Sequence, residues 1–126
     1  MKVLLDTCTL IWLTTGEQPL PARVRAALAT NEAYVSAVSA WEIAIKFAKG
    51  QLRLAEAPDR LVPAARARYG LGALPIDEDS ALHVARLPTL HGDPFDRMLV
   101  SQAIVHGLTI ATPDPKIIAY PARTIW

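Results

Sequence analysis

The sequence predicts an α/β protein with three layers, in which a central parallel sheet of four to five strands lies between helices. Short apolar segments typical of buried strands alternate with longer amphipathic segments along all 126 residues. Glycine and proline stand where helices are expected to end or begin. Strands that alternate with helices form right-handed crossovers and therefore a parallel sheet covered on both faces. We expect one domain, residues 1–126.

The first half of the chain contains two strand-like segments and three helix-like segments. We expect strands at residues 2–6 and 33–38, and helices at residues 9–14, 21–30 and about 40–49. Ser39 is predicted to cap the third helix, because Glu42 stands three residues later in a capping-box spacing. Gly50 is then a natural end for that helix.

The second half continues the same alternation and contains no linker, repeat or low-complexity segment. We expect helices at residues 58–69, 79–86, 95–106 and 115–119, and strands at residues 73–76, 109–112 and 122–126. Gly70 and Gly107 follow two of these helices, as glycine commonly does.

The composition indicates a compact protein of the reducing cytoplasm. Hydrophobic residues make up 52% of the chain and charged residues 20%, which argues against disorder. Cys8 is the only cysteine, so no internal disulfide can form. No apolar run has the roughly 18 residues that a membrane helix needs. Asp6 interrupts the apolar start, which excludes a typical signal peptide.

Two acids follow predicted strands, and two more lie near the start of predicted helices. Asp6 ends the first strand, and Asp114 follows the strand at residues 109–112. Glu42 and Asp96 fall in first helical turns, whereas Asp93 is the better N-cap. Active sites of open parallel sheets form outside the carboxyl ends of the strands, so we expect the four acids to converge there.

Each acid also has a structural explanation, because carboxylates commonly cap helices. Asp6 is the strongest site candidate, since a carboxylate among apolar residues is costly to bury without a metal or a cationic partner. Thr7, Ser39 and Thr112 could orient water or the acids, and Arg97 could pair with Asp96 or with phosphate.

An all-oxygen ligand set favours Mg²⁺ or Mn²⁺ over Zn²⁺. The three histidines and the single cysteine show no zinc-binding spacing. The net charge is +1, and subtracting the −4 of these acids leaves +5 on the rest of the chain. A mildly basic body around an acidic pocket is compatible with a polyanionic substrate.

The sequence resembles the PIN-domain family, and more narrowly the VapC-type toxin ribonucleases of bacterial toxin–antitoxin pairs. The resemblance spans nearly the whole chain and rests on four segments: Asp6-Thr7, Ser39-x-Trp41-Glu42-Ile43, His91-x-Asp93-Pro94-Phe95-Asp96-Arg97-Met98-Leu99-x-x-Gln102-Ala103, and Thr112-x-Asp114. The Asp-Pro-Phe-Asp-Arg segment is the most specific of these.

The resemblance implies an Mg²⁺- or Mn²⁺-dependent endoribonuclease that cleaves RNA phosphodiester bonds with metal-activated water. Its metal ligands and catalytic residues would be Asp6, Glu42, Asp96 and Asp114. It also implies a homodimer and a small cognate antitoxin. Two departures are Cys8, where a bulkier or polar residue is expected, and the prolines on both sides of Asp114.

Three other functions remain open from the sequence. The chain could be a non-catalytic module for RNA binding or dimerisation, with the acids serving only as helix caps. Asp6 could be a phosphoryl-accepting nucleophile, but haloacid-dehalogenase-like phosphatases usually carry a second Asp where Cys8 stands. Cys8 itself could be a nucleophile, although no strand-end histidine is placed to activate it, and a packing role is preferred.

Overall fold

The computed structural model describes all residues 1–126 and contains a five-stranded, all-parallel sheet with strand order β3-β2-β1-β4-β5. The strands are β1 (Lys2–Leu5), β2 (Glu32–Ser36), β3 (Gly72–Leu74), β4 (Thr109–Ala111) and β5 (Arg123–Ile125). Helices flank the sheet on both sides, so the predicted three-layer α/β/α class is confirmed.

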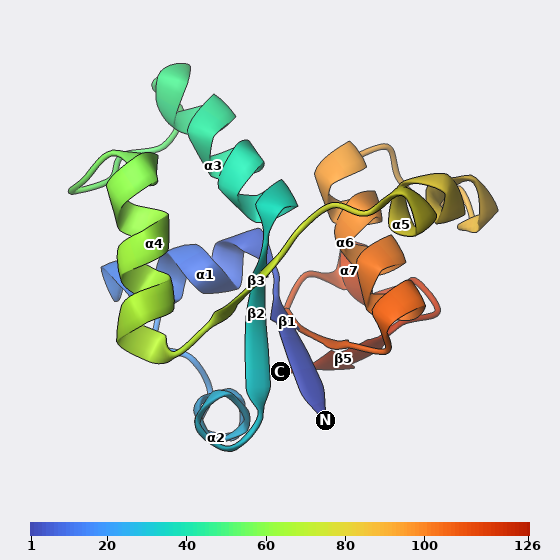
Figure 1. Cartoon of the computed structure of the whole chain (residues 1–126), viewed down its shortest axis with the longest axis horizontal. Coiled ribbons are helices and arrows are strands. Elements are labelled where there is room, and N and C mark those ends of the chain that lie inside the picture. Colours follow the sequence, from blue (N-terminus) through green and yellow to red (C-terminus); the bar gives the residue numbers. More distant parts are fainter.

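Seven α-helices and one 3₁₀-helix connect the strands. They are α1 (Thr7–Thr15), α2 (Ala22–Thr30), α3 (Ala37–Ala48), α4 (Pro58–Tyr69), α5 (Glu78–His83), η1 (Val84–Arg86), α6 (Pro94–His106) and α7 (Pro115–Ile118). Figure 1 shows α1, α2 and α4 on one side of the sheet and α5, α6 and α7 on the other. Helix α3 continues from the end of β2 and contacts α1, α4 and α6.

Alternation of side chains along β1 builds a separate core on each face of the sheet. Val3 and Leu5 belong to the core beneath α1, α2 and α4, and Leu4 belongs to the core beneath α6 and α7. All three side chains are fully buried. A strand buried on both faces reads as a continuous apolar run, which is why the start of the chain looks uniformly hydrophobic.

The strand order reverses direction at β1, and this reversal positions the candidate site. Strand β1 pairs with β2 on one side and with β4 on the other. Leu5, the last residue of β1, pairs with Ala111, the last residue of β4. Chain segments leaving β1, β2 and β4 therefore emerge together at a topological switch point, where ligands of open α/β sheets bind.

The predicted capping box at Ser39 is wrong. Helix α3 begins three residues earlier, and its N-cap is Ser36, whose Oγ accepts a hydrogen bond from the Val38 backbone N–H at 3.0 Å. The structure places Val38 in the core facing α6, so the earlier start buries an apolar residue inside the helix. Ser39 consequently lies within α3, and Glu42 lies in its second turn.

The other boundaries agree closely with the predictions. Helix α4 matches the expected range, and Gly70 follows it in a left-handed conformation, with a φ of 64°. Helix α1 starts at residue 7 rather than 9, because Asp6 acts as its cap. The expected helix at residues 79–86 is divided into α5 and η1. Each predicted strand is present and shorter by one or two residues, and β2 and β3 begin one residue earlier than expected.

None of the helices combines the length and the apolar character that a bilayer crossing requires.

Candidate active site

Asp6 leaves β1 and begins α1 with a side chain that is almost fully buried, at 2% exposure. The Thr9 backbone N–H donates to Asp6 Oδ1 at 2.8 Å, which satisfies one of the free N–H groups of the first helical turn. The Cys8 thiol contacts both carboxylate oxygens at 3.3 Å. Asp6 is thus a helix cap, and it stands at the switch point between β1 and β4.

The Cys8 thiol is held in its protonated form. Burial, and then the negative charge of Asp6, raise the pKa of Cys8 far above the ordinary value. Because the thiolate is the nucleophilic form, this environment argues against a nucleophilic Cys8 and supports a packing role.

Glu42 reaches the same edge from α3 and is also buried, at 5% exposure. The Thr7 hydroxyl donates to Glu42 Oε1 at 2.7 Å and lies 3.0 Å from the Ser39 hydroxyl. The other carboxylate oxygen, Oε2, pairs with Lys46 Nζ at 2.6 Å. Thr7, which directly follows Asp6, therefore joins the end of β1 to α3. Thr7 and Ser39 lie where the sequence predicted supporting hydroxyl groups.

Asp96 lies in the first turn of α6, and Asp93 caps that helix as predicted, accepting from the backbone N–H groups of Phe95 and Asp96. Asp96 Oδ2 lies 3.1 Å from His91 Nε2. Burial raises the pKa of Asp96 to about 6, the hydrogen bond to His91 lowers it, and the charges of Asp93, Glu42 and Asp114 raise it further.

Asp114 caps the short helix α7 and lies beside the end of β4. The Lys116 backbone N–H donates to Asp114 Oδ1 at 2.9 Å, and the Asp114 N–H donates to Thr112 Oγ1 at 3.0 Å. Pro115 occupies the first turn of α7, where no backbone N–H is required. The prolines are thus compatible with a capped helix start, and Thr112, which holds the Asp114 backbone N–H, is fully buried.

The four acids lie in one electrostatic neighbourhood. The charges of Glu42 and Asp114 act on Asp96, and those of Asp6 and Asp114 act on Cys8. Four sequence segments thus bring their carboxylates to the carboxyl edge of the sheet. Asp77, by contrast, binds Ser80 and His106 and takes no part in this cluster.

The donor chemistry fits a hard dication, but the side chains point to internal partners. Carboxylate oxygens are the ligands that Mg²⁺ and Mn²⁺ prefer. Burial is the main cause of the raised pKa of Asp96, and the neighbouring carboxylates add to it. No three His, Cys, Asp or Glu side chains are grouped closely enough to hold a metal ion. A dication at Glu42 Oε2 would compete with Lys46 for this oxygen.

Arg97 does not pair with Asp96, contrary to one of the two expectations for it. Its guanidinium donates to the Pro88 and Val84 carbonyl oxygens and to the Tyr120 hydroxyl. The backbone around η1 and the buried Tyr120 thus hold the cation away from the neighbouring carboxylate.

Sequence reasoning missed three residues that contact or face the acids. Lys46 pairs with Glu42 at a spacing of four residues, a helical pattern that could have identified it. His91 contacts Asp96 directly, and its place in the segment that carries the family resemblance was the available signal. Tyr120, from the segment after α7, contacts His91, and no spacing rule connects it to the acid.

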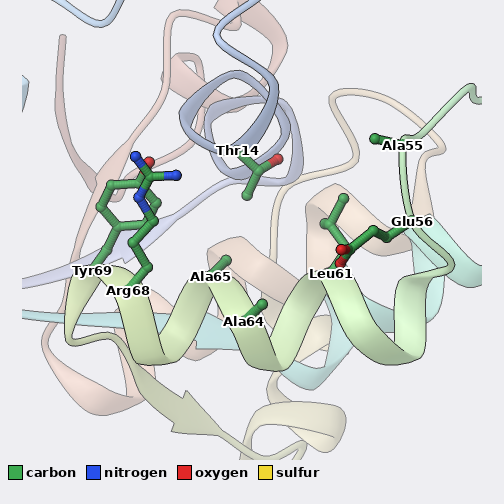
Figure 2. Close-up of a pocket in the computed structure, with 8 residues that line it drawn as sticks. All are labelled: Thr14, Ala55, Glu56, Leu61, Ala64, Ala65, Arg68 and Tyr69. Carbon is green, nitrogen blue, oxygen red and sulfur yellow. The ribbon is translucent and has the colours of Figure 1, made fainter.

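A cavity of about 290 Å³ lies away from the acids, between α1 and α4. Figure 2 shows Leu61, Ala64, Ala65, Arg68 and Tyr69 along α4, facing Thr14 of α1, with Ala55 and Glu56 from the preceding loop. None of the four acids lines it.

Comparison with known proteins identifies the fold family. The model of the PIN domain family matches residues 3–122. No curated protein matches the chain in sequence.

Solved structures share the fold at low sequence identity. VapBC2 from Rickettsia felis, bound to a DNA fragment from their promoter, has a TM-score of 0.76 at 15% identity, with 100% of this chain and 99% of that chain covered. FitAcB from Neisseria gonorrhoeae has a TM-score of 0.69 at 24% identity, with 98% and 96% covered. DNA-bound VapBC from Salmonella typhimurium has a TM-score of 0.67 at 20% identity, with 99% and 97% covered. With the family match over residues 3–122, these likenesses mean that the chain belongs to the PIN-domain family.

Proposed function

We propose that this protein is an Mg²⁺- or Mn²⁺-dependent endoribonuclease of the VapC type, the toxin component of a toxin–antitoxin pair. The observation that supports it most is the gathering of Asp6, Glu42, Asp96 and Asp114 around the switch point beside β1. Burial raises the pKa of the Asp96 carboxyl to about 6, and the negative charges of Glu42 and Asp114 add to that rise. Burying several carboxylates near one another costs folding free energy unless a bound cation compensates their charge.

The four carboxylates would hold the dication. Thr7 would orient the Glu42 carboxylate, while Ser39 contacts Thr7 and Thr112 accepts from the Asp114 backbone N–H. When bound, Mg²⁺ or Mn²⁺ would lower the pKa of a coordinated water and stabilise charge at the scissile phosphate. As an alternative, Glu42, which accepts a hydrogen bond from Thr7 at 2.7 Å, would orient the attacking water instead of binding the metal. Because water rather than the ribose 2′-hydroxyl attacks, the products would carry a 5′-phosphate and a 3′-hydroxyl.

The structural neighbours named VapBC support an antitoxin partner for this chain. Helix α3 supplies apolar surface for such a partner, because Trp41 is 56% and Phe47 37% exposed. Ile11 and Trp12 of α1 pack partly against the core instead. We also infer a homodimer, and a cytoplasmic location, where the RNA substrate is found.

The direct test is cleavage of end-labelled RNA by the metal-loaded protein. Asp6→Asn keeps the cap, because asparagine also accepts a hydrogen bond from the Thr9 N–H, but it removes the charge. We expect this variant to lose Mg²⁺-dependent cleavage and to stay folded. Asp59→Asn, at an exposed acid in the first turn of α4, is the matched control and should cleave normally.

A non-catalytic RNA-binding or dimerisation module is the second candidate, and the internal hydrogen bonds of Asp6 and Asp114 favour it. Both acids cap helices, as that alternative requires. Titration with Mn²⁺ separates the two functions. Uptake that disappears in both Asp6→Asn and Asp96→Asn supports the nuclease, whereas a wild-type protein that binds no Mn²⁺ supports the module.

A further inference from the structure

Four polar side chains form a continuous hydrogen-bonded chain that ends at Asp96. Arg97 Nη1 donates to the Tyr120 hydroxyl at 2.9 Å, and this hydroxyl lies 2.8 Å from His91 Nδ1. The opposite ring nitrogen, His91 Nε2, lies 3.1 Å from Asp96 Oδ2. His91 and Tyr120 are also in ring contact, with centroids 5.4 Å apart.

The chemistry of the groups fixes the direction of every bond in this chain. A guanidinium can only donate, so the Tyr120 oxygen accepts from Arg97. Tyr120 is 3% exposed, and its only other partner is His91 Nδ1. Its own proton must therefore go to Nδ1, since a buried hydroxyl proton without an acceptor is costly. With Nδ1 an acceptor, the ring proton is on Nε2 and is donated to Asp96.

The same chain keeps a cation off the carboxylate. Arg97, the immediate neighbour of Asp96, is bound by the Pro88 and Val84 carbonyl oxygens as well as by Tyr120. Asp96 therefore receives a hydrogen bond from His91 Nε2–H, and not an ion pair from Arg97. Only Oδ2 is engaged, which leaves Oδ1 free of internal hydrogen bonds.

We propose that His91 is a positioning residue, which orients Asp96 through Nε2–H for dication binding while Tyr120 and Arg97 lock its tautomer. The proposal rests on the proposed function for the dication, but the tautomer follows from the hydrogen bonds alone. Partners that orient metal ligands in this way typically change metal affinity by about 10- to 100-fold when they are removed.

The first experiment determines the tautomer in metal-free protein by NMR correlation of the ¹⁵N-labelled histidine rings. Only three histidines are present, and the spectrum of His91→Gln identifies the signals of His91. We expect the Nε2–H form in the wild type, and a mixture of both tautomers in Tyr120→Phe. A wild-type ring protonated on Nδ1 overturns the proposal.

The second experiment measures Mn²⁺ affinity by calorimetry in variants whose folding is verified by thermal unfolding. We expect His91→Leu to bind Mn²⁺ about tenfold more weakly. We expect His91→Gln to bind almost as the wild type does, because its amide N–H can replace Nε2–H. The matched control is His83→Leu, at a ring in α5 that makes no hydrogen bond, and it should leave the affinity unchanged.

The outcomes separate the two proposals. Wild-type Mn²⁺ affinity in His91→Leu refutes the positioning role and leaves the nuclease intact. A weakening in His91→Gln equal to that in His91→Leu also refutes it, because the donated proton would then not matter. If the wild type binds no Mn²⁺, the proposed function fails and the positioning role fails with it. The tautomer experiment still reports whether the hydrogen-bonded chain from Arg97 to Asp96 exists.

Discussion

Lys46 pairs with Glu42 across 2.6 Å, one turn further along α3, and this pair sets a fixed cation beside the acid cluster. The hydrogen bond to Glu42 raises the pKa of Lys46, and the charges of Glu42, Asp93 and Asp96 raise it further. In the absence of a dication, Lys46 is thus the cation that balances part of the negative charge at the carboxyl edge of the sheet.

Lys46 should therefore compete with a metal for Glu42. We expect Lys46→Met to tighten Mn²⁺ binding by up to about fivefold, the ratio that corresponds to ~1 kcal/mol for a solvent-accessible ion pair. Calorimetric titration at low salt measures this change. Lys49→Met, at an exposed position near the end of α3, is the control. Unchanged or weaker binding in Lys46→Met would show that the pair does not oppose the metal.

The raised pKa of Asp96 predicts how the stability of the metal-free protein depends on pH. The folded state holds the Asp96 proton more tightly, with a pKa of about 6 against 3.8. Folding stability from this group therefore falls as pH rises from about 4 to about 6 and is constant above that window. Asp96→Asn should be more stable than wild type at pH 7.5, by about 1–2 kcal/mol after allowance for solvent screening.

Urea unfolding of both proteins at pH 4 and pH 7.5, without metal, measures this effect. The quantity compared is the difference in the free energy of unfolding between Asp96→Asn and the wild type at each pH, because the contributions of other titrating groups cancel in it. Asp77 is one such group. Its hydrogen bond with His106 lowers its pKa, so its contribution is lost in acid. Equal differences at the two pH values would contradict the assignment to Asp96.

The buried bridge between Ser36 and Gln102 should be essential for stability. Ser36 Oγ donates to Gln102 Oε1 at 2.6 Å, and Gln102 Nε2 donates to the Pro75 carbonyl at 3.0 Å. Both side chains are fully buried. Gln102→Met keeps the shape but leaves a hydroxyl proton and a carbonyl unpaired, which should cost about 2–4 kcal/mol. Chemical denaturation measures the change in the free energy of unfolding, and Gln51→Met, at an exposed position, is the control. A decrease of less than about 1 kcal/mol in Gln102→Met would argue against the bridge.

The sequence was informative wherever local chemistry decides the outcome. The range of α4 was predicted correctly, because proline in its first turn and Gly70 at its end are local signals. The parallel sheet was predicted from the alternation of strands and helices. The positions of Asp6 and Asp114 at strand ends were predicted from the apolar segments that precede them. These features depend on residues that are close together in the chain.

The remaining features depend on contacts between distant segments. Ser39 and Glu42 satisfy the capping-box spacing, but burial of Val38 against α6 moved the cap to Ser36. Its place next to Asp96 in the sequence suggested that Arg97 pairs with this acid or with phosphate. In the folded chain Arg97 instead bonds Tyr120, and His91 bonds Asp96. Local patterns therefore located the acids, but they did not identify the side chains that hold them.

Gly72 illustrates a close contact that can be tested by a pair of substitutions. It pairs in register with Tyr34 across β2 and β3, and an added Cβ would lie 2.7 Å from Tyr34 Cδ1. The ring therefore covers the glycine, and Gly72→Ala should lower the free energy of unfolding by about 1–2 kcal/mol through overpacking.

In a Tyr34→Thr background the clash is absent. There the same substitution should be neutral, or should stabilise by about 0.4–1 kcal/mol through reduced chain entropy. A double-mutant cycle by urea unfolding measures the coupling, and an additive result would show that the ring moves aside without cost.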